Sequence, residues 1–293
     1  MDCLRARENP PRPSGPEPIA SYFSPLPPHE MKLLVTNDDG IGTLFLRELV
    51  QALQTAGHET FVVAPVTEQS WTGASKTRHR PVKSGAVDRG FGCPTWMVDG
   101  TPSDCVNIAL AHLLPASPGA PVVEGVVSGI NVGFNCSLGF ILASGTVAGA
   151  WEGALHGLPA MALSQDVSEE VYDHLKERGG APDGELLATL RTTAARAAQL
   201  APELFAATAR NSFTVHNLNF PYPCLPGTPL QRTVPARVHV PGLFSPAADD
   251  GSHRLLWGKI HDVSPAEPLT DIKCLERGEI SHSVLDYRRL GHG

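Results

Sequence analysis

Short apolar runs alternate with helix-like segments along residues 32–201, and this order restricts the fold more than any other feature of the chain. The first apolar run spans 32–36, and the helical pattern after it spans 44–56. The same alternation continues along the chain, with strand-like runs at 60–64, 95–98, 122–127 and 160–163 and helical patterns from 102, at 146–157 and at 183–201. Strands and helices in this order are typical of a mostly parallel sheet with helices on both faces, so we predict an α/β fold.

The composition changes at both ends of this alternating region. Residues 1–30 are dense in proline and have no periodicity, so we expect a disordered tail that buries little apolar surface. Residues 31–220 would form the α/β core. Residues 221–293 contain proline-rich loops and three strand-like runs, which predict a β-rich, antiparallel C-terminal extension with strands near 234–240, 254–260 and 280–285.

Charge and cysteine content restrict the partners and the compartment of the chain. The formal net charge is −7, with 23 basic and 30 acidic residues, which disfavours broad binding to nucleic-acid duplexes. No apolar run approaches the roughly 20 residues that cross a bilayer, so no membrane association is expected. The cysteines lack any C-x-x-C pair and are expected to be free thiols in a reducing, cytoplasmic compartment; they are Cys3, Cys93, Cys105, Cys136, Cys224 and Cys274.

Two adjacent carboxylates, Asp38 and Asp39, directly follow the first apolar run. Like charges at the end of a buried strand repel each other, and desolvation adds to the cost. A bound divalent cation would offset that repulsion. Alternatively, Asp38-Asp39-Gly40 forms a turn whose side chains cap backbone amides.

The loops after three predicted strands carry oxygen donors that could meet at one edge of the sheet. Asp38 and Asp39 follow the first strand, Ser70 follows the second, and Asn131 follows the strand near 122–127. In open α/β sheets ligands bind beyond the carboxyl ends of the strands. Carboxylate, hydroxyl and amide oxygens suit Mg²⁺, Mn²⁺ or Ca²⁺. Taken alone, a residue such as Ser70 is more often an ordinary loop hydroxyl, and one such as Asn131 is more often a turn residue.

The helix predicted from about 146 begins with the small polar stretch Ser144-Gly145-Thr146. Its amides and hydroxyls could hold a phosphate at the helix N-terminus, or serve only as a cap. Thr101 and Asp104 are interpreted as helix-capping residues rather than catalysts. Most histidines are expected on the surface or satisfied in the core, and His216 would reach the site only if its strand ended there.

Five motifs in one order resemble the SurE survival-protein family. They are VTNDDGIG, VVAPVTEQS, VDGTPSDCVNIAL, VVSGINVGFN and ASGTVAGAWEGALHGLPAMALS, which lie between residues 35 and 164. The later segment LTDIKCLERGEIS is also similar to the family. The resemblance implies a Rossmann-like core and a metal-dependent 5′-nucleotidase that acts on nucleoside monophosphates. It further implies a homodimer, or a dimer of dimers, in which the C-terminal extension is exchanged between subunits.

The resemblance also assigns roles to particular residues of this chain. One divalent ion, Mg²⁺ or Mn²⁺, would be held by Asp38, Asp39, Ser70 and Asn131, and the two aspartates would be catalytic. The phosphate or substrate would contact Asn37, Gly40, Asn135, Ser144, Gly145 and Thr146. Asp38 would position or deprotonate the attacking water, or else form an aspartyl-phosphate, and the sequence leaves both open.

This chain also departs from the family pattern. Trp71 stands where small residues are common, Ala143 replaces the tyrosine usual before Ser144, and the chain lacks the threonine-proline stretch usual near the C-terminus. These differences bear on substrate preference and on the exchanged dimer. Two other classes remain as alternatives: a differently specific nucleotide- or sugar-binding Rossmann-like protein, and a non-catalytic relative. The first would carry G-x-G-x-x-G after the first strand, and the second would have lost a metal ligand; neither is the case.

Overall fold

The computed structural model describes residues 30–114, 123–240, 242–256 and 260–289. The predicted proline-rich tail, residues 1–30, lies outside the described residues except for Glu30. In the described part, the strands are β1 (Lys32–Thr36), β2 (Glu59–Pro65), β3 (Ser84–Ala86), β4 (Thr95–Val98), β5 (Gly125–Val132), β6 (Ala160–Gln165), β7 (Thr214–Phe220), β8 (Leu230–Thr233), β9 (Val238–His239), β10 (His261–Asp262) and β11 (Ile280–Asp286). The helices are α1 (Leu44–Thr55), α2 (Pro102–Ile108), the π-helical turn η2 (Ala109–Leu113), α3 (Ser137–Ala143), α4 (Gly145–Leu155), α5 (Glu169–Glu177), α6 (Gly184–Ala206), α7 (Asp271–Glu276) and the 3₁₀ turn η3 (Tyr287–Arg289).

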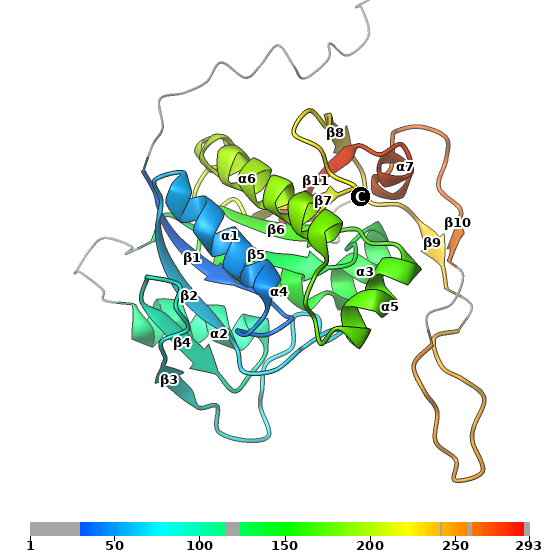
Figure 1. Cartoon of the computed structure of the whole chain (residues 1–293), viewed down its shortest axis with the longest axis horizontal. Helices are drawn as coiled ribbons and strands as arrows, with labels where there is room; N and C mark the ends of the chain where they lie inside the picture. Colours follow the sequence, from blue (N-terminus) through cyan, green and yellow to red (C-terminus); the bar gives the residue numbers. More distant parts are fainter. Residues whose placement is uncertain (1–29, 115–122, 241, 257–259, 290–293) are drawn as a thin grey trace, which may run out of the picture.

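One mixed sheet runs through the molecule in the strand order β3-β4-β2-β1-β5-β6-β7-β11-β8 (Figure 1). The strands from β4 to β7 are parallel, whereas β3 pairs antiparallel with β4 and β11 pairs antiparallel with β7. From β1 the chain first builds the sheet toward β2 and β4, and then returns to build it toward β5, β6 and β7. The strand order therefore reverses between β1 and β5, which is where open α/β sheets bind ligands.

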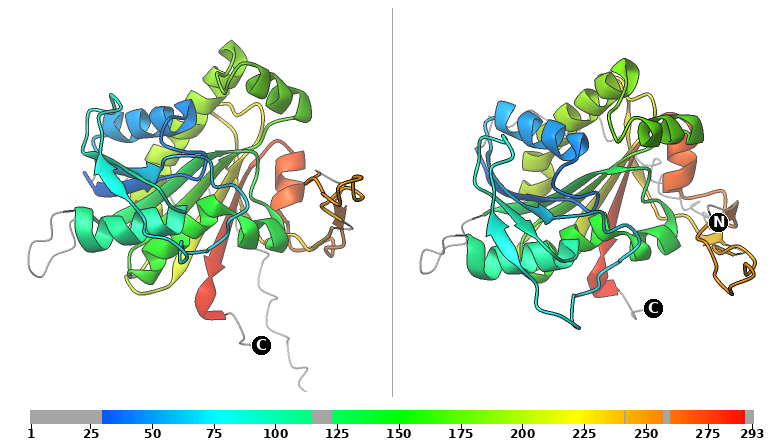
Figure 2. Two further views of the ribbon diagram at one scale, coloured as in Figure 1. Left: turned by 90° about the horizontal axis from the view of Figure 1, so that it is seen from below. Right: turned by 60° about the horizontal axis from the view of Figure 1, so that its bottom comes forward.

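Helices cover both faces of this sheet, as Figure 2 shows from two further sides. On one face α1 and α6 pack over a core that includes Leu33, Val35 and Leu218. On the other face α2 and α4 pack over a core that includes Leu34 and Val126. Adjacent residues Leu33 and Leu34 belong to different cores because successive strand side chains point to opposite faces. The predicted α/β architecture with a mostly parallel sheet is confirmed.

The helices begin at the residues whose side chains can cap them. Thr43 caps α1 by accepting a hydrogen bond from the amide of Leu46. Thr101 and Asp104 form a capping box at the start of α2, with Pro102 in the first turn, so the interpretation of both residues as caps is confirmed. A cap of this kind contributes about 1 kcal/mol, which is enough to define where a helix starts.

Two segments differ from the sequence prediction. Residues 128–131, predicted to form a loop, belong to β5, which begins at Gly125 rather than near 122. The pairing of β5 with β6 shifts between Ser128 and Asn131, where Gly129 has φ of 138° and lies against Leu163. A Cβ on Gly129 would lie 2.4 Å from the carbonyl oxygen of Leu163, so only glycine fits. This bulge explains why a strand here reads like a loop in the sequence.

The second difference concerns helices. The sequence prediction omitted α3 and α5, which are short and lie in segments rich in glycine or charge. Within the described residues no single helix is long and apolar enough to cross a membrane. Only α3 and α4 taken together reach that length and hydropathy, and they are bent by 71° where they meet.

The residues after 220 contribute to the main sheet and also lie outside it. β11 pairs with β7 and, on its other edge, with β8, so the predicted strand near 280–285 is confirmed. β9 and β10 form a separate antiparallel pair, and the strand predicted at 234–240 is reduced to Val238–His239. The strand predicted at 254–260 falls partly outside the described residues. Of that segment, Leu255 forms an isolated antiparallel bridge with Phe244.

A buried histidine pair joins β7 to β11. His216 Nδ1 lies 2.9 Å from His282 Nε2, and His216 Nε2 lies 2.7 Å from the hydroxyl of Thr208. Burial lowers the pKa of His216 to about 4 and that of His282 to about 3, and the nearby positive charge of Arg232 adds to both shifts. Both imidazoles are therefore neutral at pH 7, and the hydrogen bond between them joins two uncharged rings.

We expect this pair to make the fold acid-sensitive. The unfolded chain binds protons at His216 below its usual pKa of about 6.5, whereas the folded chain resists protonation down to about 4. His216 therefore costs no stability above pH 6.5, and its resistance to protonation lowers the free energy of unfolding as the pH drops toward 4, by about 2 kcal/mol for His216 alone at pH 5. The variant His282→Gln should show a smaller fall in melting temperature from pH 7.5 to pH 5 than the wild type. An equal or larger fall in the variant would show that the pair does not cause the acid sensitivity.

Candidate metal and phosphate site

The predicted site residues lie at the carboxyl ends of β1 and β5, on either side of the point where the strand order reverses. Asp38 and Asp39 follow β1 directly, and Asn131 is the next-to-last residue of β5. Ser70 belongs to the loop that leaves β2. Parallel neighbouring strands end at the same edge of the sheet, so the fold brings these three segments together.

Asp38 connects the end of β1 to the N-terminus of α4. The hydroxyl of Thr146 donates a hydrogen bond of 2.5 Å to Asp38 Oδ1. The amide of Gln69 donates to the backbone carbonyl of Asp38 at 2.7 Å. A Cβ on Gly145 would lie 2.8 Å from the Cβ of Asp38, so the helix start touches the aspartate directly. These contacts hold Asp38 in a fixed place, with 3% of its surface exposed.

Asp39 connects β1 to the end of β5. The amide of Val132 donates to Asp39 Oδ2 at 3.2 Å, and Val132 directly follows Asn131. The side chain of Asn131 donates to the carbonyls of Val132 and Gly133, at 3.2 and 2.7 Å. The carboxylate of Asp39 and the side-chain amide of Asn131 therefore both lie at the carboxyl end of β5.

The aspartate pair is electrostatically unfavourable in the protein alone. Burial raises the pKa of Asp38, and it raises the pKa of Asp39 well above its usual range, with the charge of Asp38 adding to the shift in Asp39. Glu68 raises both pKa values further. A cation between these groups would reverse the balance, since positive charge stabilises the ionised carboxylates.

The residues present fit a divalent cation that prefers oxygen ligands. Within the described residues there is no group of three or more His, Cys, Asp or Glu side chains that could hold a metal. Any ion at the aspartate pair would therefore need neutral oxygen ligands as well. Asn37 directly precedes the aspartate pair, and its buried side-chain oxygen, Oδ1, has no hydrogen-bond partner. Two carboxylates together with neutral oxygens are a donor set that suits Mg²⁺ or Mn²⁺.

Ser70 lies on the solvent side of this group. Its hydroxyl donates to Glu68 Oε1 at 2.7 Å, and the residue is exposed. The structure thus brings the Ser70 loop to Asp38 through Gln69, but it forms no direct bond between Ser70 and either aspartate. Glu68 is a nearby carboxylate that the sequence reasoning missed, because an isolated glutamate in a polar loop gives no distinctive signal.

The predicted phosphate-binding residues surround the start of α4 and the turn after β1. Ser144 caps α4 by accepting from the amide of Val147 at 3.1 Å, and Gly145 and Thr146 form its first turn. Asn37 donates from its side chain to the carbonyl of Gly40 at 3.0 Å, which closes the turn. Gly40 adopts φ of 97°, a conformation that residues with a side chain rarely adopt.

Asn135 is held by side chains that the sequence reasoning did not identify. Its amide donates to Asn219 Oδ1 at 2.7 Å, and its side chain donates to the hydroxyl of Ser164 at 2.9 Å. Asn217 donates to the carbonyl of Asn135 at 2.9 Å. Asn217 and Asn219 alternate along β7 and share one face of the sheet, which leaves His216 on the other face. His216 therefore does not reach the site.

Asp271 fixes the next part of the same loop from the C-terminal region. Its buried carboxylate accepts from the amides of Ser137 and Ala236, at 2.8 and 2.9 Å. Burial raises the pKa of Asp271, while these backbone hydrogen bonds act in the opposite direction. The segment around 269–281, similar to the family in sequence, thus supports the loop that carries Asn135.

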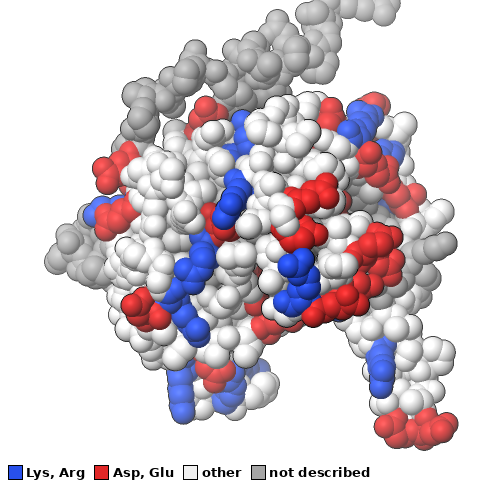
Figure 3. All heavy atoms as spheres, in the orientation of Figure 1, with Lys and Arg blue, Asp and Glu red and all other residues white. Residues whose placement is uncertain are grey.

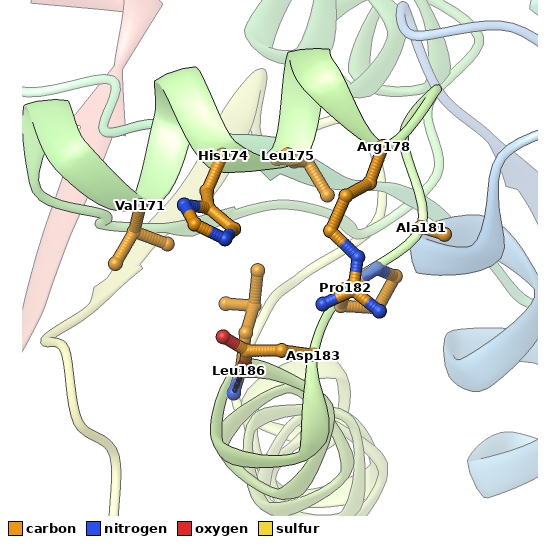
Figure 4. Close-up of a pocket in the computed structure, with 8 residues that line it drawn as sticks. All are labelled: Val171, His174, Leu175, Arg178, Ala181, Pro182, Asp183 and Leu186. Carbon is orange, nitrogen blue, oxygen red and sulfur yellow. Dashed lines mark hydrogen bonds between the residues drawn. The ribbon is translucent and has the colours of Figure 1, made fainter.

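Other surface features lie away from the aspartate pair. A small hollow between α5 and α6 is lined by side chains that include His174, Arg178 and Asp183 (Figure 4), and it contains none of the predicted site residues. On the face shown in Figure 3, Asp and Glu side chains gather on the right of the view, and most Lys and Arg side chains lie to the left of them.

Comparisons with known proteins agree with this architecture. Residues 33–239 match the sequence profile of the family described as survival protein SurE. A Nostoc protein named 5′-nucleotidase SurE is 46% identical over 136 residues, which is 46% of this chain and 49% of that protein. A Desulfovibrio desulfuricans protein of the same name is 36% identical over 265 residues, 89% of this chain and 95% of that protein. A crystal structure of the SurE protein from Aquifex aeolicus superposes with a TM-score of 0.61 at 25% identity, covering 89% of this chain and 97% of that chain.

The fold and the site define an α/β protein with a carboxylate pair, buried Asp38 and half-buried Asp39, at the switch point of its sheet. The match to the family profile and the extended similarity to the Desulfovibrio protein show that the chain belongs to the SurE family. The chain spans about half the length of the first curated relatives it matches.

Proposed function

We propose that this chain is a metal-dependent 5′-nucleotidase, which hydrolyses nucleoside 5′-monophosphates to nucleoside and phosphate. The observation that carries the proposal is the contact between the aspartate pair and the N-terminus of α4, through the bond from Thr146 to Asp38. A helix N-terminus favours a phosphate group, and the carboxylates favour a cation. At this contact, a phosphate group bound at the start of α4 would lie next to a cation bound by the aspartates.

Asp38, Asp39, Ser70 and Asn131 would hold one Mg²⁺ or Mn²⁺ ion. When bound, such an ion lowers the pKa of a coordinated water and withdraws charge from a phosphate oxygen. Neither metal is favoured by the donor set.

The chain's own residues would orient and stabilise the reacting groups. The amides at the start of α4 would donate to the phosphate oxygens, on which charge develops during the reaction, while the hydroxyl of Thr146 keeps its bond to Asp38. Asn135 would donate from the opposite loop, where the side chains of Asn217 and Asn219 hold it. Asp38 would orient the attacking water or accept its proton. In the alternative mechanism, Asp38 itself attacks phosphorus and forms an aspartyl-phosphate.

The assembly and the setting of the chain are also part of the proposal. We infer a homodimer, or a dimer of dimers, because the C-terminal segment carries exposed apolar side chains such as Phe244 and Leu255. We infer action in the cytoplasm, which accords with the free cysteines among the described residues, Cys93, Cys105, Cys136, Cys224 and Cys274. The net charge of −7 accords with a small-molecule substrate rather than a nucleic-acid duplex.

Activity with and without metal tests the proposal. We expect protein stripped with a chelator to lose hydrolysis of nucleoside 5′-monophosphates, and added Mn²⁺ or Mg²⁺ to restore it, because the candidate ligands are oxygens. Phosphate release should be measured on a panel of nucleoside monophosphates. Full activity in excess chelator would contradict the metal requirement. No phosphate release from any monophosphate with either metal would favour the alternative, a nucleotide- or sugar-binding protein of different specificity.

A further inference from the structure

Trp71 is an exposed aromatic residue directly beside a candidate metal ligand, Ser70. Its exposed fraction is 39%, which is large for a tryptophan in a folded chain. Its backbone has φ of 63°, in the left-handed region that bulky residues rarely adopt. Strained conformations of this kind persist where the surroundings hold them, and they concentrate at functional sites.

Backbone hydrogen bonds anchor the Trp71 loop to the site on both sides. Before Trp71, the amide of Gln69 donates to the carbonyl of Asp38 at 2.7 Å. After it, the amide of Gly73 donates at 2.9 Å to the carbonyl of Ala143, the residue just before the cap of α4. Trp71 thus lies in a loop that is held to the end of β1 on one side and to the residue before the cap of α4 on the other.

Trp71 also belongs to a cluster of aromatic rings. Its ring lies 5.6 Å from that of Phe140 at an angle of 77°, and the ring of Phe140 lies 6.1 Å from that of Phe134 at 81°. Phe134 directly precedes Asn135, a candidate phosphate contact. These ring contacts therefore link the Ser70 loop to the loop that carries Asn135, and the buried ring of Phe140, 6% exposed, packs edge-on against Trp71.

We propose that Trp71 provides the surface on which the base of the nucleotide stacks. The inference rests on the proposed function and specifies its substrate class: phosphate esters that carry a planar aromatic base, in preference to sugar phosphates without one. Every nucleotide base has a flat aromatic face, so any of the bases can stack on a tryptophan ring. The aliphatic side chains exposed nearby on α3, Leu138 and Leu142, offer a surface for another protein chain, but they supply no flat ring.

A matched pair of substrates isolates the base. Adenosine 5′-monophosphate and ribose 5-phosphate share the phosphate and the sugar, and only the first carries a base. In the presence of Mn²⁺, the variant Trp71→Ala should lose roughly tenfold in kcat/KM for adenosine 5′-monophosphate, mainly through KM, and change little for ribose 5-phosphate. Trp71→Phe should retain most of the preference, because phenylalanine keeps an aromatic face. Tyr172→Ala on α5, an aromatic residue also 39% exposed, is the control and should alter neither substrate.

Every outcome decides the question. Equal losses on both substrates would mean that Trp71 acts by shaping the Ser70 loop, and no change on either would mean that the base does not touch it; both overturn the proposal. Calorimetric binding of adenosine, which carries no phosphate, tests Trp71 without turnover: affinity should fall about tenfold in Trp71→Ala and persist in Trp71→Phe. If Trp71→Ala binds adenosine as tightly as the wild type does, the proposal that the base stacks on Trp71 is wrong. A wild-type protein that binds adenosine but releases no phosphate contradicts the proposed function instead.

Discussion

Asp39→Asn should reduce turnover of a nucleoside monophosphate by about two orders of magnitude or more, while the chain keeps its fold. The substitution preserves size and removes one of the two charges that would attract the cation. Initial rates at saturating Mn²⁺, beside far-UV circular dichroism, provide the measurement. Asp173→Asn, an exposed aspartate on α5, is the matched control and should leave the rate unchanged.

The same variant should be at least as stable as the wild type when no metal is present. In the folded chain the pKa of Asp39 is raised by burial and by Asp38, so its ionised form is less favourable there than in the unfolded chain. At neutral pH that difference lowers the free energy of unfolding, and neutralising Asp39 removes it. A turn-capping aspartate would behave differently: asparagine also caps, so activity would survive. Near-normal turnover of Asp39→Asn would therefore support the capping alternative.

Gly145→Ala should also abolish most of the activity, for a steric reason. The new Cβ would lie 2.8 Å from the Cβ of Asp38 and 2.9 Å from the carbonyl oxygen of Gln69, closer than such atoms approach. The backbone oxygen cannot rotate away, so α4 must shift relative to β1 and the Ser70 loop. Displacements of about 1 Å at a reacting centre reduce rates by roughly 100-fold, and we expect a loss of that size in kcat/KM.

A neighbouring glycine provides the control for this prediction. Gly139 lies in α3, and a Cβ there would meet no atom within 4 Å. Gly139→Ala should therefore keep its activity and gain a little stability, since alanine favours helix over glycine by roughly 0.5–1 kcal/mol. Equal activity in the two alanine variants would show that the approach of α4 to Asp38 is not needed for function.

The sequence predicted the sheet well where strand and helix signals were local. The runs at 32–36 and 95–98 match β1 and β4, because apolar residues in a parallel sheet are buried on both faces and appear as continuous runs. The carboxyl-end rule then placed the aspartate pair correctly beside β5. The roles of the site residues remain proposals, but their proximity follows from strand order.

The features that the sequence did not reveal depend on contacts between distant residues. Asp271 lies 134 positions from Ser137, whose amide it accepts, and no local pattern links the two. Asn217 and Asn219 read as polar interruptions of a strand, and only the fold shows that they hold Asn135. The bulge at Gly129 has the same character, since its glycine is required by Leu163 on the neighbouring strand.

The most direct test of the central claim is metal binding by the chain itself. Stripped wild-type protein should bind one Mn²⁺ per chain, measured by loss of the free-ion electron paramagnetic resonance signal. Its melting temperature should rise with added Mn²⁺, because an ion that binds only the folded state at 100 times its dissociation constant adds about 2.7 kcal/mol. Asp39→Asn should show neither effect at the same concentrations. Stoichiometric binding and full thermal stabilisation in Asp39→Asn, equal to the wild type, would contradict the assignment of the cation to the aspartate pair after β1.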